Sequence, residues 1–386
     1  MSWHTCRLGD FLTLKRGHDL PANLRQEGEV PVVSSSGITG YHSESKASAP
    51  GVVTGRYGTL GEVFYLEKDY WPLNTALYIV DFKGCYPRFA AYFLKNALKN
   101  YQSDKAAVPG IDRNVLHELK VRVPTLAIQL QIADTLWAYD NHIENNSRRI
   151  QLLEESTRLL YREWFVHLRF PGHEQLKVLD GVPQGWSRQA LEAICLPKDG
   201  IQTGPFGSQL HQSDYADDGI PVVMPKDIAS RRVSLQSIAR IPESLANQLG
   251  RHRMQIGDTV YGRRGDIGRR AFIGPRQDGY FCGTGCLRFR PDPVIVNPRY
   301  LFDQLGAPDT EGCIINRAKG STMPNLSAGA LKTVPILLPP KRIQDSYAEA
   351  VEPTNSLIET LVEQSQKLAQ ARDLILPRLM SGELSV

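Results

Sequence analysis

The sequence predicts a mixed α/β fold with two globular α/β domains, separated by two long antiparallel helices that form a coiled coil, and an internal pseudo-twofold repeat. Three observations predict it. Landmark motifs of the first half recur in the second half in the same order. Each half opens with short apolar runs that Gly, Pro, Ser and Asn interrupt, which is typical of strands joined by turns. Each half then ends in a long stretch with helical periodicity.

The internal repeat rests on four pairs of segments. The offset between the copies grows from 190 to 215 residues along the chain, which predicts insertions in the second globular part. The ends of the copies match better than their middles, which favours one scaffold that recognises two different targets. The paired segments are 30–33 with 220–223, 55–61 with 262–268, 87–89 with 298–300, and 108–128 with 323–343.

The apolar runs predict the strands of each globular part. In the first copy we expect a helix over residues 89–98, preceded by strands at 30–33, 51–53, 63–66 and 77–82. In the second copy we expect the corresponding strands at 221–224, 259–261, 271–273 and 286–290.

A long helix is predicted over residues 126–165, which would be roughly 60 Å long at a rise of about 1.5 Å per residue. Its apolar positions alternate four and three residues apart, as in a coiled coil, with polar interruptions at Asn146 and Thr157. The full set is Ile132, Leu136, Tyr139, Ile143, Asn146, Ile150, Leu153, Thr157, Leu160 and Trp164.

A second, less regular helical stretch follows near the end of the chain, where we expect Pro353 to kink or restart the helix and Pro377 to end it. Its apolar positions are Ile358, Leu361, Leu368 and Ile375. An apolar stripe as long as the one on the first helix needs another helix to pack against it. The two helices of one chain can pack on each other, which we favour, or two chains can form a homodimeric coiled coil.

Composition excludes several classes of protein. With 41% hydrophobic and 22% charged residues, the chain is neither disordered nor collagen-like. It has no run of 18 apolar residues that would predict a membrane span, and its N-terminus lacks the apolar core of a signal peptide. Six scattered cysteines predict free thiols in a reducing cytoplasm.

The net charge of +4 is unevenly distributed. Residues 1–108 hold 12 basic and 10 acidic residues, and residues 166–322 hold 20 and 16, whereas both helical stretches have one acidic residue in excess. Seven arginines and no lysine lie between Arg251 and Arg276, against two aspartates. Because arginine pairs in a bidentate manner with phosphate and with guanine edges, this cluster indicates a nucleic-acid contact rather than only a solvated surface.

The arginine cluster surrounds a glycine-rich turn, Gly262-Arg263-Arg264-Gly265-Asp266-Ile267-Gly268, which repeats Gly55-Arg56-Tyr57-Gly58-Thr59-Leu60-Gly61. No Gly-Lys-Ser/Thr follows, so it is not a nucleotide-hydrolase phosphate loop. Either it holds Arg56 and Arg263 outward to DNA, or it is a purely structural hairpin. The DNA-binding residues predicted are Arg56, Tyr57, Thr59, Arg251, Arg253, Arg263, Arg264, Asp266, Arg269 and Arg270.

Signals of catalysis are weak throughout. Cys282 and Cys286 have no histidine or second cysteine pair nearby, so core or free thiols are favoured over zinc, and no metal site is expected. Asn297-Pro298-Arg299-Tyr300 lacks the second proline of an adenine-methyltransferase loop. Glu118-Leu119-Lys120 has a nuclease-like spacing without the supporting acidic pair. We therefore expect no catalytic residue.

Five groups of motifs follow one another in order over nearly the full length of the chain. They are Trp3 with Leu8-Gly9-Asp10, Leu119-Lys120-Val121 with Gln131-Ile132-Ala133, Trp164-Phe165-Val166 with Pro183-Gln184-Gly185-Trp186, Leu338-Pro339-Pro340 with Ile343-Gln344, and Leu376-Pro377-Arg378-Leu379-Met380-Ser381-Gly382-Glu383-Leu384. Through these motifs the chain resembles the DNA specificity subunits of type I restriction–modification systems. Lys341-Arg342 departs from the family pattern, in which an acidic residue usually precedes the Gln that is Gln344 here.

The resemblance implies target-recognition domains at 1–124 and 169–340 and conserved helical spacer regions at 125–168 and 341–386. It implies that each recognition domain binds one half of a split double-stranded DNA target and that the helices set the spacer between the halves. It further implies two methyltransferase subunits and restriction endonuclease subunits as partners. S-adenosylmethionine, ATP and magnesium would bind to those partners, with no cofactor in this chain. Spacer and docking roles would fall to Ile132, Leu136, Ile143, Ile150, Leu153, Ile358, Leu361 and Leu368.

Two other hypotheses stay open at the level of sequence. The chain could be a stand-alone DNA methyltransferase or nuclease, which would act without a partner. It could also be a coiled-coil scaffold unrelated to DNA.

Overall fold

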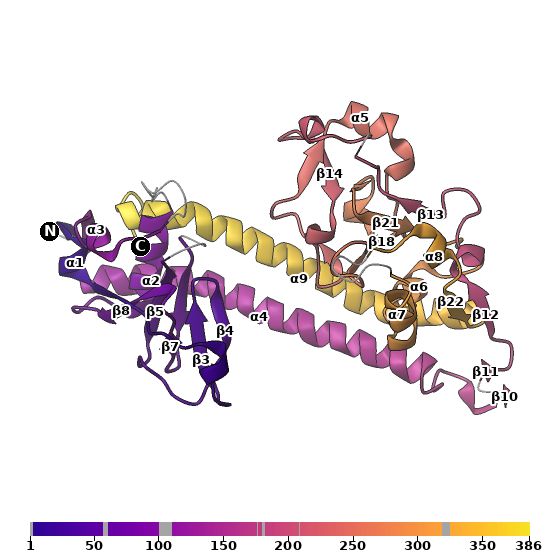
Figure 1. The fold of residues 1–386 in the computed structure, drawn as a ribbon, viewed down its shortest axis with the longest axis horizontal. Coiled ribbons are helices and arrows are strands. Elements are labelled where there is room, and N and C mark those ends of the chain that lie inside the picture. Colours follow the sequence, from indigo (N-terminus) through magenta and orange to yellow (C-terminus); the bar gives the residue numbers. More distant parts are fainter. Residues whose placement is uncertain are drawn as a thin grey trace. The chain divides into compact units, whose positions relative to one another are not determined.

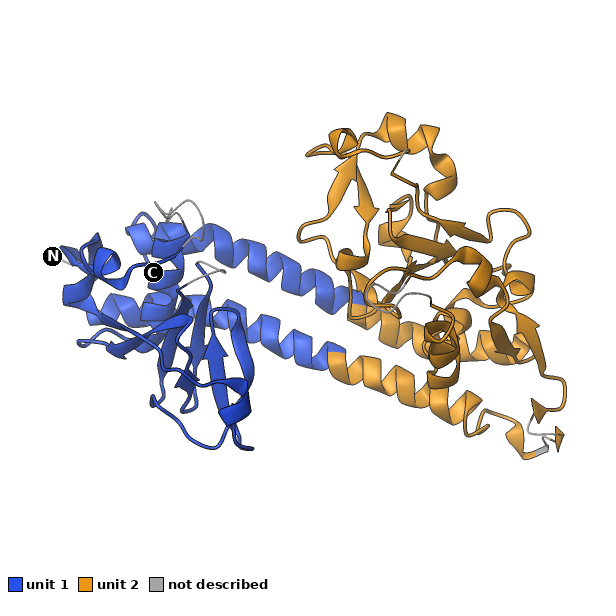
Figure 2. Ribbon diagram, viewed as in Figure 1, with its two compact units in different colours: residues 1–150, 359–386 blue, residues 151–358 orange. Residues whose placement is uncertain are grey.

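The computed structural model consists of two compact units, one formed by residues 1–150 with 359–386 and the other by residues 151–358 (Figures 1 and 2). Two long helices, α4 (Leu126–Phe165) and α9 (Lys341–Ser381), each contribute one end to each unit. The four-segment division by sequence stays a prediction. The residues that the structure describes are 3–56, 61–99, 110–175, 177–179, 182–207, 209–318 and 325–386.

Unit 1 contains three small sheets and three short helices. A four-stranded sheet has the order β2-β8-β5-β6, a three-stranded sheet has the order β4-β3-β7, and β1 pairs with β9. The strands are β1 (Trp3–Arg7), β2 (Thr13–Arg16), β3 (Val30–Ser34), β4 (Gly37–His42), β5 (Gly51–Gly55), β6 (Val63–Leu66), β7 (Trp71–Pro72), β8 (Ala76–Asp81) and β9 (Lys120–Pro124). The helices are α1 (Leu8–Phe11), α2 (Pro87–Leu98) and α3 (Arg113–His117).

Unit 2 repeats these three sheets in the same order, as β13-β21-β18-β19, β17-β14-β20 and β12-β22. A parallel pair of strands also recurs, since β3 runs parallel to β7 and β14 runs parallel to β20. The strands are β12 (Ser187–Ala190), β13 (Ile201–Thr203), β14 (Ile220–Val223), β17 (Ala239–Ile241), β18 (Thr259–Gly262), β19 (Arg270–Phe272), β20 (Phe281–Cys282), β21 (Cys286–Phe289) and β22 (Pro335–Leu338). The predicted repeat and mixed α/β class are confirmed.

The insertions predicted for the second copy are also present. Among the described residues, the hairpin of β15 (Ile228–Ala229) with β16 (Arg232–Val233) and the helices α5 (Glu243–Gln248) and α7 (Pro308–Ile315) lie within the second copy and have no counterpart in the first. The helices α6 (Pro298–Gln304) and α8 (Ala328–Lys332) occupy the places of α2 and α3. A further hairpin, β10 (Val178–Leu179) with β11 (Val182–Pro183), precedes the second copy.

The two long helices pack on each other in both units, in the manner of an antiparallel pair. In unit 1, the beginning of α4 lies against the end of α9, where Ile132 and Leu136 share a core with Leu376 and Leu379. In unit 2, the end of α4 lies against the beginning of α9, where Trp164 meets Tyr347. All ten predicted seam positions of α4 are buried or half-buried. The intramolecular pairing is thereby confirmed.

Contrary to the prediction from its prolines, the second helix neither restarts at Pro353 nor ends at Pro377. α9 continues through both Pro353 and Pro377. Each proline lies on the exposed side of the helix, and so do Glu349 and Asp373, whose carbonyls lose their usual N–H partner four residues later. Water can satisfy these carbonyls, while the buried neighbours on the opposite side hold the helix in place.

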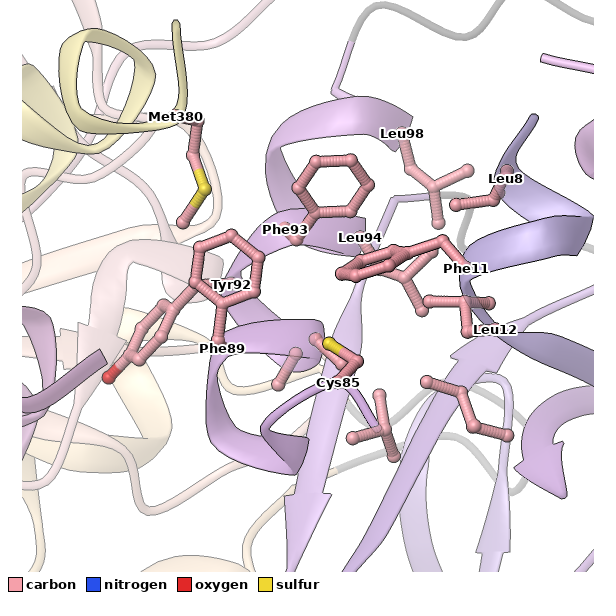
Figure 3. Close-up of a cluster of buried hydrophobic side chains, with 14 of the residues drawn as sticks. Leu8, Phe11, Leu12, Cys85, Phe89, Tyr92, Phe93, Leu94, Leu98 and Met380 are labelled. Carbon is pink, nitrogen blue, oxygen red and sulfur yellow. The ribbon is translucent and has the colours of Figure 1, made fainter. Parts of the chain in front are cut away.

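The core of unit 1 forms where α2 packs between its sheet and the two long helices (Figure 3). Phe89 and Phe93 lie one turn apart on α2 and meet Phe11 edge-on. Met380 of α9 points toward the same ring cluster, as Figure 3 shows. Fully buried side chains of this size stabilise a fold by about 1.5–3 kcal/mol each.

Candidate nucleic-acid interface

The glycine-rich turn of unit 2 is the connection of a β-hairpin, because it joins β18 to the antiparallel strand β19. Gly262 donates a backbone hydrogen bond to Arg269, which closes the turn. Gly265 and Gly268 have φ values of +74° and +116°, which strongly favour glycine. The corresponding turn of unit 1 likewise joins the antiparallel strands β5 and β6.

Three of the predicted DNA-binding side chains are exposed on the turn of unit 2. Arg264 is exposed and forms no ion pair with a described residue. Asp266 and Arg269 are also exposed, and they pair with each other at 2.6 Å. Arg264 is therefore the cation of this turn that is most available to an external anion.

Arg263 and Arg270 do not point outward, because other parts of the protein cover most of both side chains. Arg263 is 7% exposed, since it continues the fully buried strand β18, and its backbone is hydrogen-bonded to Gly285 and Leu326. Arg270 pairs with Glu311 of α7 at 3.6 Å and donates to the Phe302 carbonyl. Burial lowers the pKa of both guanidinium groups. The expectation that the turn holds Arg263 outward is wrong.

The remaining arginines of the predicted interface are placed as follows. Arg251 is exposed, and its Nε donates to the buried His252. Arg253 pairs with Glu243 of α5. Arg56 is half-buried at the end of β5, where its backbone N–H donates to Thr75. Tyr57 and Thr59 lie outside the described residues.

Behind the turn of unit 2 lies a pocket of about 300 Å³ that sequence reasoning did not find. The turn forms one side of it, and the β15–β16 hairpin and α7 form the others. Its lining combines three arginines with two carboxylates and apolar side chains. The lining residues are Ile228, Ser230, Arg231, Asp266, Ile267, Gly268, Arg269, Arg270 and Glu311.

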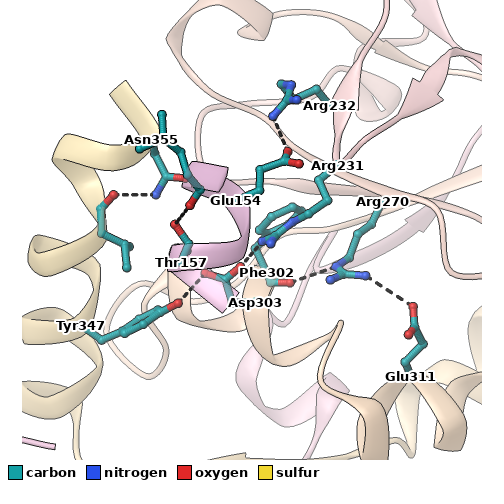
Figure 4. A network of polar contacts seen from close by, with 12 residues as sticks. Glu154, Thr157, Arg231, Arg232, Arg270, Phe302, Asp303, Glu311, Tyr347 and Asn355 are labelled. Carbon is teal, nitrogen blue, oxygen red and sulfur yellow. Dashed lines mark hydrogen bonds and ion pairs between the residues drawn. The ribbon is translucent and has the colours of Figure 1, made fainter. Parts of the chain in front are cut away.

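The β15–β16 hairpin contributes a further group of polar contacts that was not predicted (Figure 4). Arg231 pairs with the buried Asp303 of α6, which also accepts a hydrogen bond from Tyr347 of α9. Arg232 pairs with Glu154 of α4. The sequence of this turn contains neither Gly nor Asn, so a hairpin could not be predicted from it. The adjacent arginines Arg231 and Arg232 are the one feature that could have drawn attention to the segment.

The eight residues predicted for the helical spacer and for subunit docking are covered side chains. Ile132, Leu136, Ile150, Ile358 and Leu361 are buried, and Ile143, Leu153 and Leu368 are half-buried. Their position suits a role in holding the helices together.

Cys282 and Cys286 are free, buried thiols in adjacent strands β20 and β21. Burial raises the pKa of Cys282 to about 12 and that of Cys286 well above its ordinary value. A protonated, buried thiol is a poor metal ligand and a poor nucleophile. Within the described residues, no group of three or more His, Cys, Asp or Glu side chains could hold a metal ion. Nor is any described helix both apolar and long enough to cross a membrane.

Comparison with known proteins gives concordant matches along the whole chain. A family model, described as the type I restriction modification DNA specificity domain, matches residues 1–155 and again 212–370. The MjaVIII type I restriction enzyme specificity subunit of Methanocaldococcus jannaschii is 21% identical and covers 100% of this chain and 93% of its own length. The EcoprrI specificity subunit of Escherichia coli is 27% identical over 34% of the chain.

The fold is also similar to a solved structure. The crystal structure of a type I restriction–modification S subunit from M. genitalium aligns over 98% of this chain and 96% of its own, with a TM-score of 0.60 and 15% sequence identity. At this identity the similarity concerns the fold alone. The first match of the family model contains all the strands of unit 1, and the second begins after β12 and β13 and contains the other strands of the three sheets of unit 2.

Proposed function

The chain belongs to the type I restriction–modification DNA specificity family, and from this membership we propose that it is the non-catalytic specificity subunit of such a complex. The globular part of each unit recognises one half of a bipartite double-stranded DNA target. The observation that supports this most is the duplicated set of three sheets, because two similar scaffolds with different loops suit two different half-sites.

In unit 2, we propose that the exposed side of the glycine-rich turn contacts DNA through Arg264. This side chain is exposed and unpaired among described residues, whereas Arg263 and Arg270 are covered by protein. Arg269 and Asp266 neutralise each other. A single free guanidinium at the tip of a rigid hairpin is the geometry that bidentate recognition of a guanine edge needs.

We propose that methyltransferase subunits dock on the outer face of the helices. On α4 and just after it, three apolar side chains repeat every seven residues and are exposed: Leu152 at 67%, Leu159 at 48% and Val166 at 55%. The inner seam of α4 is already occupied by α9. Exposed apolar side chains that line up along a helix are stabilised when another protein covers them. A helix of a methyltransferase subunit would cover this stripe, since its own apolar positions repeat at the same spacing.

We further propose that methylation, cleavage and translocation of DNA, with S-adenosylmethionine, ATP and magnesium, belong to the methyltransferase and restriction subunits. The chain would then act in the cytoplasm, where its DNA lies, and its six free cysteines suit that reducing compartment.

The decisive experiment is to sequence the DNA methylome of cells with and without this gene. A bipartite motif with one fixed spacer, lost when the gene is removed, is the expected result. Methylation or cleavage by the purified chain alone would instead show an enzyme. A complex whose DNA binding is absent or insensitive to salt would indicate a scaffold, since binding to phosphates releases counterions and weakens with salt.

A further inference from the structure

The β15–β16 hairpin is an insertion of the second copy. In unit 1, β3 is followed directly by its antiparallel partner β4, with Ser35 and Ser36 between them. In unit 2, the corresponding strands β14 and β17 are separated by residues 224–238, which contain this hairpin. The hairpin forms a two-stranded sheet of its own. Its strands pack into a core of the unit through Ile228 and Val233, and its tip contacts other elements.

The tip of the hairpin, residues 230–232, has an unfavourable backbone conformation at its first two residues. Ser230 and Arg231 have φ values of +47° and +62°, as in a type I′ turn, which strongly prefers Asn-Gly. A non-glycine residue held there persists only when its surroundings determine it, and such residues concentrate at functional positions. The contacts of the two arginines at this tip supply those surroundings.

Arg231 is held by two neighbouring residues of α6. Its guanidinium pairs with Asp303, a carboxylate that is 7% exposed, and it lies over the ring of Phe302 at 4.8 Å from the centroid. The other oxygen of Asp303 accepts a hydrogen bond from the buried Tyr347 hydroxyl at 3.0 Å. Through this carboxylate, the hairpin tip is joined to α9.

Arg232 reaches the other long helix. Its Nη1 lies 2.5 Å from Oε1 of Glu154 on α4, and the two side chains are only 21% and 14% exposed. An ion pair shielded from water to this extent is screened far less than a surface pair, and loss of one partner leaves a poorly solvated charge. The tip of the hairpin therefore bonds to α4 through Arg232 and, by way of Asp303 of α6, to α9 through Arg231.

We propose that this anchoring hairpin, defined as residues 228–233 with Arg231 and Arg232 at its tip, is a spacing determinant: it fixes the second recognition domain on the helix pair so that the complex accepts one spacer length. Arg231 and Arg232 are positioning residues and do not contact DNA. The inference rests on the proposed function and deepens it.

The physical reason is the geometry of duplex DNA. One base pair more or less in the spacer displaces a half-site by about 3.4 Å and rotates it by about 34°. A recognition domain that swings on its helices by this much would accept neighbouring spacers. Between β3 and β4 of unit 1 no such hairpin is inserted, and in that unit Arg88 of α2 stacks on Trp137 of α4 at 4.1 Å from the ring centroid.

The test uses the full complex with its methyltransferase subunits and reads all methylated motifs by methylome sequencing. Arg232→Gln and the charge reversals Arg232→Glu and Glu154→Arg are compared with the double reversal. We expect methylation of sites with spacers one base pair longer or shorter to rise roughly tenfold in the single variants, with both half-site sequences unchanged. The double reversal restores the single spacer. Lys332→Gln, which removes a surface pair with Glu192 in the same unit, is the control and leaves the spacer fixed.

Two results would overturn the inference. One is an unchanged spacer in Arg232→Gln with methylation intact. The other is a uniform loss of methylation, for all spacers, that the double reversal does not repair, since this shows a merely structural pair. If the unmodified complex yields no bipartite motif, the proposed function itself fails, and this outcome is distinct from both.

Discussion

At the scale of residues, a buried glutamine carries out the same task in each unit. Nε2 of Gln129 donates to the carbonyl of Pro124 and its Oε1 accepts from the backbone of Tyr86, both at 2.9 Å. Gln344 repeats this pattern with Pro339 and Asn297 at 2.7 and 2.8 Å. The glutamine thus joins the start of a long helix to the start of α2 or α6. The neutral amide donates at one of these points and accepts at the other, whereas an ionised carboxylate could only accept.

We therefore predict that Gln129→Glu lowers the free energy of unfolding of the full-length chain by about 1–3 kcal/mol. The carboxylate cannot donate to the Pro124 carbonyl, and its charge is buried. Urea unfolding at neutral pH measures the effect. Gln131→Glu, at an exposed position two residues further along α4, is the control. Equal losses in the two variants would contradict the assigned role.

His252 adds a dependence of stability on pH. Its Nδ1 bonds the Thr203 carbonyl at 2.9 Å, its Nε2 accepts from Arg251 at 3.2 Å, and the ring is fully buried. Burial, followed by the charge of Arg251, lowers its pKa to about 4. As the pH falls, the unfolded chain protonates this histidine at a higher pH than the folded chain does. The stability that the neutral, buried ring contributes is therefore fully present above about pH 6.5 and is lost as the pH falls toward 4.

The predicted consequence is a loss of at most about 3 kcal/mol between pH 6.5 and 4 that His252→Gln abolishes. Thermal melts of the full-length chain across this range measure it. His211→Gln, at an exposed position of the same unit, should keep the full slope. A slope that survives in His252→Gln would assign the acid sensitivity to other groups.

At the scale of elements, the two adjacent arginines of the hairpin turn in unit 2 have different surroundings, and we assign them different roles. Arg263 lies inside, beneath the turn, while Arg264 faces solvent. A turn of this kind can present a side chain rigidly only because the rest of it is fixed by protein. The two residues should therefore respond differently to the same substitution.

We expect Arg264→Ala to weaken recognition of one half-site only, by about 1–3 kcal/mol of discrimination, with thermal stability unchanged. Arg263→Ala should lower thermal stability instead. Binding of the complex to DNA with single base changes in each half-site separates the two. A uniform weakening for all sequences, with a shallower dependence on salt, would make Arg264 a phosphate contact.

At the scale of the whole molecule, α4 and α9 are the elements that run from one unit into the other. We predict that removal of seven residues from α4 and the matching seven from α9 shortens the preferred spacer by about three base pairs, since seven residues span about 10 Å of helix. Removal of whole heptads keeps the buried seam in register. Methylome sequencing reports the spacer directly. An unchanged spacer would exclude the helices as its determinant.

The large elements could be predicted because each has a strong local signal. The repeat, the main strands and the 126–165 helix follow from apolar periodicity, and α4 has the predicted bounds. Pro353 led to a wrong expectation for α9, because on the exposed face of a helix water can bind the carbonyl that a proline leaves without a partner. Arg288 could not be foreseen: it is fully buried in β21, where it donates to the Asp199 and Arg251 carbonyls. Such tertiary partners leave no trace in a local pattern.

The discontinuous course of unit 1 has a consequence for how the protein is made. Leu376, Leu379 and Met380, which complete the core around Phe89 and Phe93, leave the ribosome only after the whole of unit 2. All of residues 151–358 are synthesised while that core stays open. A chain truncated between residues 358 and 376 would therefore have a complete second unit and an incomplete core in the first, and proteases that remove damaged proteins would degrade it.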